Sequence, residues 1–406
     1  MTETLYWIWL TQCPGLGATR LRQLLELAGS PETLCAAGEE ELTRMGVPQA
    51  LRGPLLDKRL DRARTILQAC DRLGITVLTP DSPAYPDSMR RTADAPAVLY
   101  CRGRLPEWGG RPWIGLVGSR QADARGLTLA RRFGAEIAAC GGVVVTGMAK
   151  GVDAAAAAGA LDQNCPVVGV LGGGVDVVYP RENAALFERV AGQGCLLSEY
   201  PPGTSPNARH FPARNRIISA LSDGVVVVQA AEGSGALITA RWAAEQGREV
   251  FSVPGPAGEA LSRGCNLLLR DGAILAESGL DVMREYLYRY PGAVRMQNAK
   301  CKMQNETDTE NRSGAHRCAT GQRPPESPVC PPESSVGAHS VRPPLDGLTP
   351  EQRAIVDALA EGPLQLDALI DKTGLPAARV LPQLTVLQIK KILNQLPGKQ
   401  YELSGG

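Results

Sequence analysis

Three glycine-rich turns carry the residues that could bind a phosphate group. Each follows a short apolar run, and they are Gly118-Ser119-Arg120, Gly172-Gly173-Gly174 and Gly233-Ser234-Gly235. Glycine lets backbone N–H groups approach an anion, and a helix that begins after such a turn adds its positive dipole end. Arg120 adds a planar guanidinium that matches the geometry of phosphate. The turns together favour a phosphate-bearing ligand, although the glycines could also serve only to pack strands closely against helices.

Further cations follow in two other segments. Lys150 lies within 146–151, directly after a valine-rich run. The second segment, 210–216, we place just before an apolar helix at 217–221, and its candidate contacts are Phe211, Arg214, Asn215 and Arg216. Two guanidiniums, an amide and an aromatic ring suit a sugar-phosphate chain whose bases can stack. The alternative places Phe211 in the core and leaves the arginines solvated.

Groups for catalysis are scarce in this sequence. Of the 3 histidines, only His210 lies outside 291–347, so an imidazole base could come only from that residue. A Gly-x-Ser-x-Gly elbow and a Walker lysine are missing, and the first apolar run is not followed by Gly-x-Gly-x-x-Gly. The carboxylates near the turns more often cap helices or orient arginines, and they are Asp153, Asp176, Glu182 and Glu199. We therefore predict a protein that is not an enzyme, with no catalytic residues and no cofactor.

Cysteine usage and hydropathy predict a cytoplasmic protein. The 11 cysteines are an odd number without a Cys-x-x-Cys pair, which is typical of reduced thiols. Within 291–347, the spacing of the cysteines and histidines matches no zinc pattern, so we predict no metal site. No apolar stretch approaches the ~20 residues that span a bilayer, and the first residues lack a secretory signal, so we expect no membrane contact.

Charge and length restrict how the chain could bind nucleic acid. Lys+Arg 43 against Asp+Glu 42 gives a net charge of +1, so a nucleic-acid site must be a local basic patch. Aromatic residues make up only 4%, which argues against a broad base-stacking surface. The 406 residues exceed what one core usually organises, so several domains are expected.

The central part of the chain alternates between strands and helices. Short valine-rich runs stand at 114–117, 143–145, 167–171, 195–197, 225–228 and 250–253, with stretches of helical length between them. This pattern predicts a parallel sheet covered by helices on both faces. We expect an α/β, doubly wound, Rossmann-like domain over 76–290. Because the carboxyl ends of parallel strands meet at one edge, the glycine turns should converge there.

The flanking segments differ in texture from this domain. Residues 1–75 show helical periodicity, and Gly15-Leu16-Gly17 resembles the turn of a helix-hairpin-helix or SAM-like domain, although a plain helix–helix turn stays open. The polar, proline-rich stretch 291–347 predicts a disordered linker. Residues 348–406 predict a winged helix of three helices and a hairpin. Its third helix carries only Arg379 as a cation, so binding of a partner stays open beside DNA readout.

Long motifs over roughly 80–280 resemble the DNA-processing family DprA, also called Smf. They stand in the family's order and include 118–120, 146–153, 171–183, 198–203, 211–219 and 234–240. The resemblance implies a non-catalytic protein that binds single-stranded DNA without sequence preference and loads the recombinase RecA onto incoming DNA in natural transformation. It also implies a homodimer and a basic pocket at the glycine edge, with Arg120 and Lys150 as the best phosphate contacts.

The sequence departs from the family at one position and leaves one alternative. Where the family commonly has histidine after Gly-x-Asp-Ala-Ala-Ala, this chain has Ala157. The alternative is a nucleotide phosphoribohydrolase on the same type of fold. Such enzymes carry Gly-Gly-x-Gly-Thr-x-x-Glu at the third glycine turn, and here the corresponding stretch ends in Thr239 without the glutamate.

Overall fold

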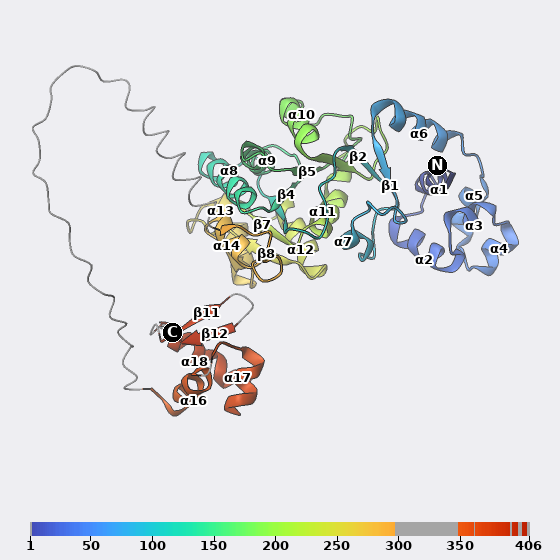
Figure 1. The fold of residues 1–406 in the computed structure, drawn as a ribbon. Coiled ribbons are helices and arrows are strands. Elements are labelled where there is room, and N and C mark those ends of the chain that lie inside the picture. The colour runs from blue at the N-terminus through green and yellow to red at the C-terminus, as the bar shows by residue number, and fades with distance from the viewer. Residues whose placement is uncertain (1, 297–347, 361, 390–391, 397–399, 404–406) are drawn as a thin grey trace, which may run out of the picture. The chain divides into compact units, whose positions relative to one another are not determined.

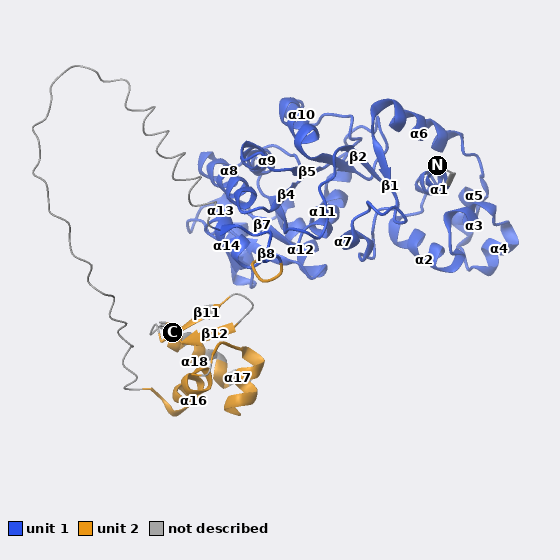
Figure 2. Ribbon diagram, viewed as in Figure 1, with its two compact units in different colours: residues 1–286, 290–303 blue, residues 287–289, 304–406 orange. Residues whose placement is uncertain are grey.

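The computed structural model describes residues 2–296, 348–360, 362–389, 392–396 and 400–403 (Figure 1). Its contacts divide the chain into two compact units, residues 1–286 with 290–303 and residues 287–289 with 304–406 (Figure 2). The predicted linker lies outside the described residues from 297 onward. The domain boundaries at 75/76, 290/291 and 347/348 stay predictions.

Unit 1 is built on a nine-stranded sheet in the order β1-β2-β6-β5-β4-β3-β7-β8-β9. Its strands are β1 (Thr76–Leu78), β2 (Leu99–Gly103), β3 (Trp113–Val117), β4 (Val143–Thr146), β5 (Val167–Val170), β6 (Cys195–Ser198), β7 (Gly224–Val227), β8 (Glu249–Ser252) and β9 (Ile274–Leu275). Neighbours from β6 to β9 pair in parallel. The predicted doubly wound α/β fold is confirmed.

The sheet is mixed, whereas the sequence predicted parallel strands only. β2 pairs antiparallel with β6, and β1 pairs antiparallel with β2. Both strands precede the alternation of strands and helices, so no crossover helix forces them to run parallel to the others. They extend the sheet at its β6 edge, next to the N-terminal helices.

Helices cover both faces of the sheet, as the crossovers require. They are α8 (Ala124–Ala139), α9 (Val152–Asp162), η1 (Arg181–Asn183), α10 (Ala184–Gln193), α11 (His210–Leu221), α12 (Gly235–Glu245), α13 (Ala260–Arg270) and α14 (Gly279–Arg284). Right-handed crossovers that step from β3 to β6 place their helices on one face. The crossover from β6 back to β7, and the one from β7 to β8, step in the opposite direction and place their helices on the other face. Accordingly α8 packs on α9, and α11 packs on α12.

The order of the strands fixes where a ligand can bind. β3 lies between β4 and β7, and the chain steps away from it in opposite directions. The connection from β3 leads to β4 on one side, and the connection from β7 leads to β8 on the other. The two connections diverge at the carboxyl ends of these neighbouring strands, which leaves a crevice there. The first and third glycine turns follow these two strands, so both lie at this switch point.

Helix α11 begins earlier than the sequence indicated. The sequence predicts a helix only at 217–221, whereas the helix starts at His210 and contains the whole motif. Pro212 is tolerated because it occupies the first turn, where N–H groups have no partner within the helix. The motif side chains therefore project from a rigid helix rather than from a loop.

The N-terminal part of unit 1 is helical, as predicted. It contains α1 (Thr2–Thr11), α2 (Ala18–Ala28), α3 (Pro31–Ala36), α4 (Glu39–Arg44), α5 (Gln49–Leu56) and α6 (Asp61–Leu73), and the short α7 (Asp87–Arg90) follows β1. Its core includes Leu34, Leu42 and Leu55, all fully buried. Trp7 Nε1 donates to Asp81 Oδ2 at 2.8 Å, which ties these helices to the segment after β1. The interpretation of the turn before α2 stays open.

Unit 2 contains the predicted winged helix. Its helices are α16 (Pro350–Leu359), α17 (Leu366–Thr373) and α18 (Ala377–Ile389), and its strands β10 (Leu364–Gln365), β12 (Gln400–Leu403) and β11 (Leu393–Leu396) form one sheet in that order. The helices pack around Ile355, Leu369 and Leu384. Arg379 on α18 is exposed and lies 3.2 Å from Glu351.

The described residues bear on the expectations about membrane spans, cysteines and metal ligands. No helix in the described part of the chain is long and apolar enough to cross a membrane. The eight cysteines within it are free thiols. Among those same residues, no three His, Cys, Asp or Glu side chains gather in a way that could hold a metal ion.

Candidate nucleic-acid interface

A cavity of about 690 Å³ lies at the switch point of the sheet. Its walls come from the turn after β3, the first turns of α11 and the start of α12. A second cavity of about 260 Å³ shares Arg120, Tyr179 and Phe211 with it and reaches the second glycine turn and Lys150. We call the two cavities together the switch-point groove.

The first glycine turn is held from both sides. The Ser119 N–H donates to the Gln229 carbonyl at 2.6 Å, and the Ser119 carbonyl accepts from the Val152 N–H at 3.1 Å. Asp123 caps α8 by accepting from the Gly126 N–H, and this bond, with one from Gln229, lowers the pKa of its carboxyl group. The Ser119 N–H is therefore not available to a ligand. The contact that this turn offers to a ligand in the groove is the Arg120 side chain.

The second glycine turn makes room for the chain that faces it. A Cβ on Gly172 would lie 3.0 Å from the Phe211 ring, and one on Gly173 would lie 2.9 Å from the Thr204 carbonyl oxygen. The Gly174 N–H donates to that same oxygen at 2.9 Å. Gly172 and Gly173 line the smaller cavity, whereas Gly174 lines neither. At this turn the glycines therefore allow close packing, which is the alternative role that the sequence left open.

The third glycine turn leads into α12. Ser234 caps this helix, because its Oγ accepts from the Ala236 N–H at 3.3 Å. Ser234 and Gly235 line the larger cavity, whereas Gly233 lies outside both. The φ of Gly233 is 78°, a conformation that favours glycine. The positive end of the α12 dipole thus faces the groove, which favours an anionic ligand.

Arg120, Phe211 and Tyr179 form a stack in the groove. The Arg120 guanidinium lies 4.9 Å from the centre of the Phe211 ring, and the Tyr179 ring stacks at 5.5 Å from Phe211. Tyr179 is 49% exposed, and Arg120 is also exposed. Within the described residues Arg120 forms no salt bridge, and its charge lowers the pKa of the nearby Asp153 against the effect of burial. This cation is therefore free to bind a phosphate beside an accessible aromatic surface.

Lys150 is available to a ligand in spite of an ion pair. Its Nζ lies 2.5 Å from Glu182 Oε2, and the two side chains are 53% and 55% exposed. Exposed ion pairs stabilise proteins little, because water and salt screen them. A phosphate can therefore replace Glu182 as the partner of Lys150.

Arg214 lies beneath the groove as a clamp between two strand ends. Its Nη1 donates to the carbonyls of Gly147, at 2.6 Å, and of Val170, which follow or end β4 and β5. Burial lowers the pKa of Arg214 to about 10, and the nearby Asp153 opposes this shift. Burial also raises the pKa of Asp153, against the effect of Arg214. Arg214 stays protonated at neutral pH and lines both cavities.

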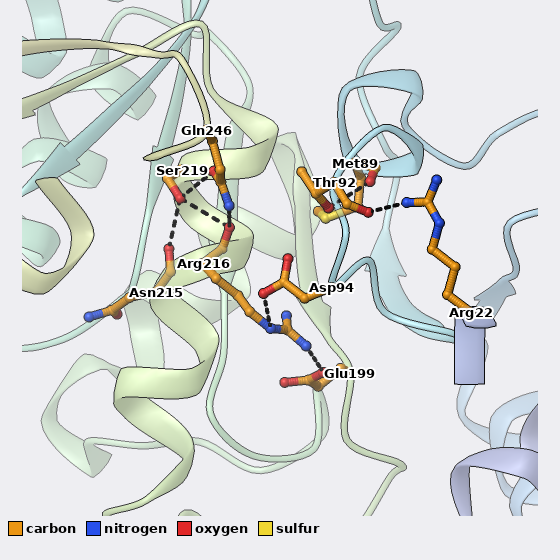
Figure 3. Close-up of polar contacts among 9 residues, drawn as sticks. All are labelled: Arg22, Met89, Thr92, Asp94, Glu199, Asn215, Arg216, Ser219 and Gln246. Carbon is orange, nitrogen blue, oxygen red and sulfur yellow. Dashed lines mark hydrogen bonds and ion pairs between the residues drawn. The ribbon is translucent and has the colours of Figure 1, made fainter. Parts of the chain in front are cut away.

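The side chains of Asn215 and Arg216 project from α11 in different directions. Asn215 lines the larger cavity, and its Nδ2 donates to the Gly235 carbonyl at 3.2 Å. Arg216 lines neither cavity. Its guanidinium lies between Asp94 and Glu199, as Figure 3 shows. Of the two arginines in the motif, one is buried under the groove and the other is ion-paired behind it.

The groups that might have served catalysis are engaged in structural contacts. Both Asp176 carboxylate oxygens accept from the Gly203 N–H, at 2.9 and 3.0 Å. His210 stacks on Tyr200 with ring centres 3.9 Å apart, and its Nδ1 lies 3.0 Å from the Gly172 carbonyl oxygen. Because a carbonyl only accepts, Nδ1 carries the proton. Glu182 and Glu199 are ion-paired with Lys150 and Arg216.

The groove contains residues that the sequence did not single out as contacts. They include Tyr179, Gln121, Pro206 and Ile238. Tyr179 had one signal, since it is an aromatic residue shortly after the second glycine turn. Pro206 lies in the connection between β6 and α11, after the motif 198–203 ends.

The fold and the groove define a doubly wound α/β protein with cations, an aromatic stack and a helix N-terminus at its switch point. A family model described as DNA recombination-mediator protein A matches residues 76–287, and one described as DprA winged helix domain matches 340–399. The chain belongs to the DprA/Smf family, which confirms the resemblance seen in its motifs.

Relatives with known names support this assignment. Protein Smf of Synechocystis is 32% identical over 416 residues, which cover 99% of both chains. The DNA processing protein DprA of Bacillus subtilis is 41% identical over 220 residues, covering 54% of this chain and 74% of the relative. The X-ray structure of DprA from Streptococcus pneumoniae superposes with a TM-score of 0.61 at 31% identity, covering 69% of this chain and 96% of that chain.

Proposed function

We propose that this protein binds single-stranded DNA without sequence preference in the switch-point groove and acts there without catalysis. The observation that carries the proposal is the stack of Arg120, Phe211 and Tyr179, which offers a free cation beside an exposed aromatic face. A cation binds the phosphate of any nucleotide, and an aromatic ring stacks on any base. Both contacts are independent of sequence.

The groove supports DNA binding better than cleavage of a free nucleotide. The phosphoribohydrolase signature would place a glutamate at the position of Thr239, whose side chain is buried at the start of α12. The neighbouring carboxylates that could replace it hold Lys150, Arg216 or backbone N–H groups. Asp153 also lines the larger cavity, but it is buried beside Arg214 and accepts from the Ala149 N–H, so it too is held by protein groups.

The wider role follows from the family. Its model is described as a recombination mediator, and relatives are named DNA processing proteins. We infer that the chain delivers single-stranded DNA to the recombinase RecA in the cytoplasm during natural transformation, and that it does so as a homodimer. The winged helix then serves a partner, because α18 carries a single cation, Arg379, which is too little charge to hold a nucleic-acid backbone.

Binding of a fluorescein-labelled oligothymidine, followed by anisotropy with the full-length protein, tests this proposal. The variant R120A/K150A should lose about tenfold or more in affinity, because two charged hydrogen bonds to phosphate are removed. Arg62→Ala is the control, since Arg62 is exposed on α6 and lines neither cavity. Unchanged affinity in the double variant would refute the site, and release of free base from nucleoside monophosphates would favour the hydrolase.

A further inference from the structure

We propose that Arg216 is a positioning residue for the switch-point groove and not a DNA contact. Asp94 and Glu199 hold its guanidinium, and this fixes α11 so that Phe211 faces the groove. The inference rests on the proposed function, since its readout is DNA binding. It differs from the sequence-based expectation, which grouped Arg216 with the phosphate contacts.

The geometry shows an arginine held from two directions. Arg216 Nε lies 3.2 Å from Asp94 Oδ2, and its Nη2 lies 2.6 Å from Glu199 Oε2 (Figure 3). The Arg216 side chain is only 12% exposed. Asp94 lies between α7 and β2, and Glu199 directly follows β6. The arginine therefore connects α11 with two separate parts of the sheet region.

The local charge argues against a phosphate contact at this position. One guanidinium between two carboxylates leaves a net charge of −1, which repels a phosphate that approaches it. Lys150 differs, because it has one carboxylate partner and both groups are more than half exposed. To bind DNA, Arg216 would have to leave two partners from a nearly buried position.

The direction of the side chain fits an anchor on the back of the helix. Successive helical residues are rotated by about 100°, so Arg216 projects about 140° away from Phe211 and about 160° away from Arg214. Phe211 and Arg214 line the groove, and Arg216 does not. A contact on the opposite side of α11 sets the depth and rotation at which the helix presents the other two residues.

Further contacts hold both ends of this anchor in place. Gln246, which follows α12, donates from Nε2 to the Arg216 carbonyl at 3.2 Å and accepts from Ser219 Oγ at 2.7 Å (Figure 3). On the other side, the Thr92 carbonyl accepts from Arg22 Nη1 of α2 at 2.6 Å. The segment that carries Asp94 is thus supported by the N-terminal helices.

The variant D94N/E199Q distinguishes the two roles by the sign of its effect. If Arg216 contacted DNA, removal of its two carboxylate partners would free it and raise the affinity for oligothymidine. If Arg216 positions α11, the same variant should lose about tenfold in affinity, because small displacements of binding groups are costly. The control E39Q/E40Q makes the same change in charge at exposed residues of α4 and should leave affinity within about twofold.

The dependence of binding on salt gives a second readout that a lost phosphate contact would change. Each phosphate contact to a single strand contributes about 0.7 to the slope of log affinity against log salt. The variant R216K keeps a charge but cannot hold two carboxylates with a planar fork, so affinity should fall while the slope stays unchanged. A slope that falls by about 0.7 in R216M would identify a direct contact and overturn the proposal.

The outcomes separate this inference from the proposed function. If the wild-type protein does not bind oligothymidine, the proposed function fails. If it binds and R120A/K150A does not, but D94N/E199Q binds equally well or more tightly, only the positioning role is overturned. If tryptophan fluorescence shows that the double variant does not fold, the single variants D94N and E199Q take its place. A loss of affinity for oligothymidine in them supports the positioning role, and an unchanged or higher affinity overturns it.

Discussion

Replacing Arg214 by alanine should destabilise unit 1 by about 3–5 kcal/mol, because the residue is a buried clamp. Its guanidinium donates to the carbonyls of Gly147 and Val170 at the ends of β4 and β5. Each buried carbonyl left without a donor costs about 1–3 kcal/mol. The nearby Asp153 is buried as well, and it would lose the cation that most favours its charged form.

Urea denaturation followed by tryptophan fluorescence measures this loss. All 5 tryptophans lie in unit 1, at Trp7, Trp9, Trp108, Trp113 and Trp242, so their signal follows that unit. With a slope of about 2–3 kcal/mol per molar urea, the midpoint should fall by about 1–2.5 M without a change in slope.

A second substitution identifies the cause of the loss. In R214A/D153N, the uncompensated carboxylate is gone, so part of the lost stability should return. The two carbonyls stay without donors, so recovery should be incomplete. A midpoint within experimental error of the wild type for R214A would show that the arginine is not a clamp and would refute this reasoning.

The remaining predictions use single substitutions in the same protein. Arg120→Ala should lower the salt slope of oligothymidine binding by about 0.7, so that its deficit shrinks about 2.6-fold between ~50 and ~200 mM salt. Phe211→Ala should weaken binding by about 1–3 kcal/mol at every salt concentration, and equal slopes in both variants would contradict these roles. Burial raises the pKa of Glu136 above 4.5, so stability in urea should fall as pH rises through that raised pKa, and Glu136→Gln should remove this part of the fall. A Cβ on Gly134 of α8 would lie 2.1 Å from a backbone oxygen of α9, so Gly134→Ala should cost about 1–3 kcal/mol. Gly192→Ala, in open space on α10, should instead stabilise by about 0.5–1 kcal/mol, and equal effects in urea titrations would be inconsistent with the packing.

Periodicity in the sequence was sufficient to predict the main elements of the fold. Buried parallel strands are short, continuous apolar runs. The runs predicted between 114 and 253 lie within a few residues of β3 to β8 in the structure. The sequence missed the edge strands β1 and β9, which are only 3 and 2 residues long, and β2 beside β1, whose run Leu99–Gly103 ends in Arg102 and Gly103. The start of α11 was also missed, since Pro212 in its first turn hides the helical pattern.

The candidate site was predictable in its location but not in the role of each side chain. Parallel strands bring their carboxyl ends to one edge, so the turn at 118–120 had to lie near that at 233–235. Arg214 and Arg216, however, looked alike in the sequence, and one is a buried clamp while the other lies between two carboxylates.

The sequence by itself determined the type of fold, the family and the edge of the sheet where cations gather, because these depend on local periodicity and on contiguous motifs. Only the tertiary structure decided which cations are free. Asp94, Glu182 and Glu199 come from separate parts of the chain, and their distances to Arg216 and Lys150 depend on how the strands and helices pack. An ion pair depends on the distance between two side chains in the folded protein, and the spacing of residues along the chain does not reveal that distance.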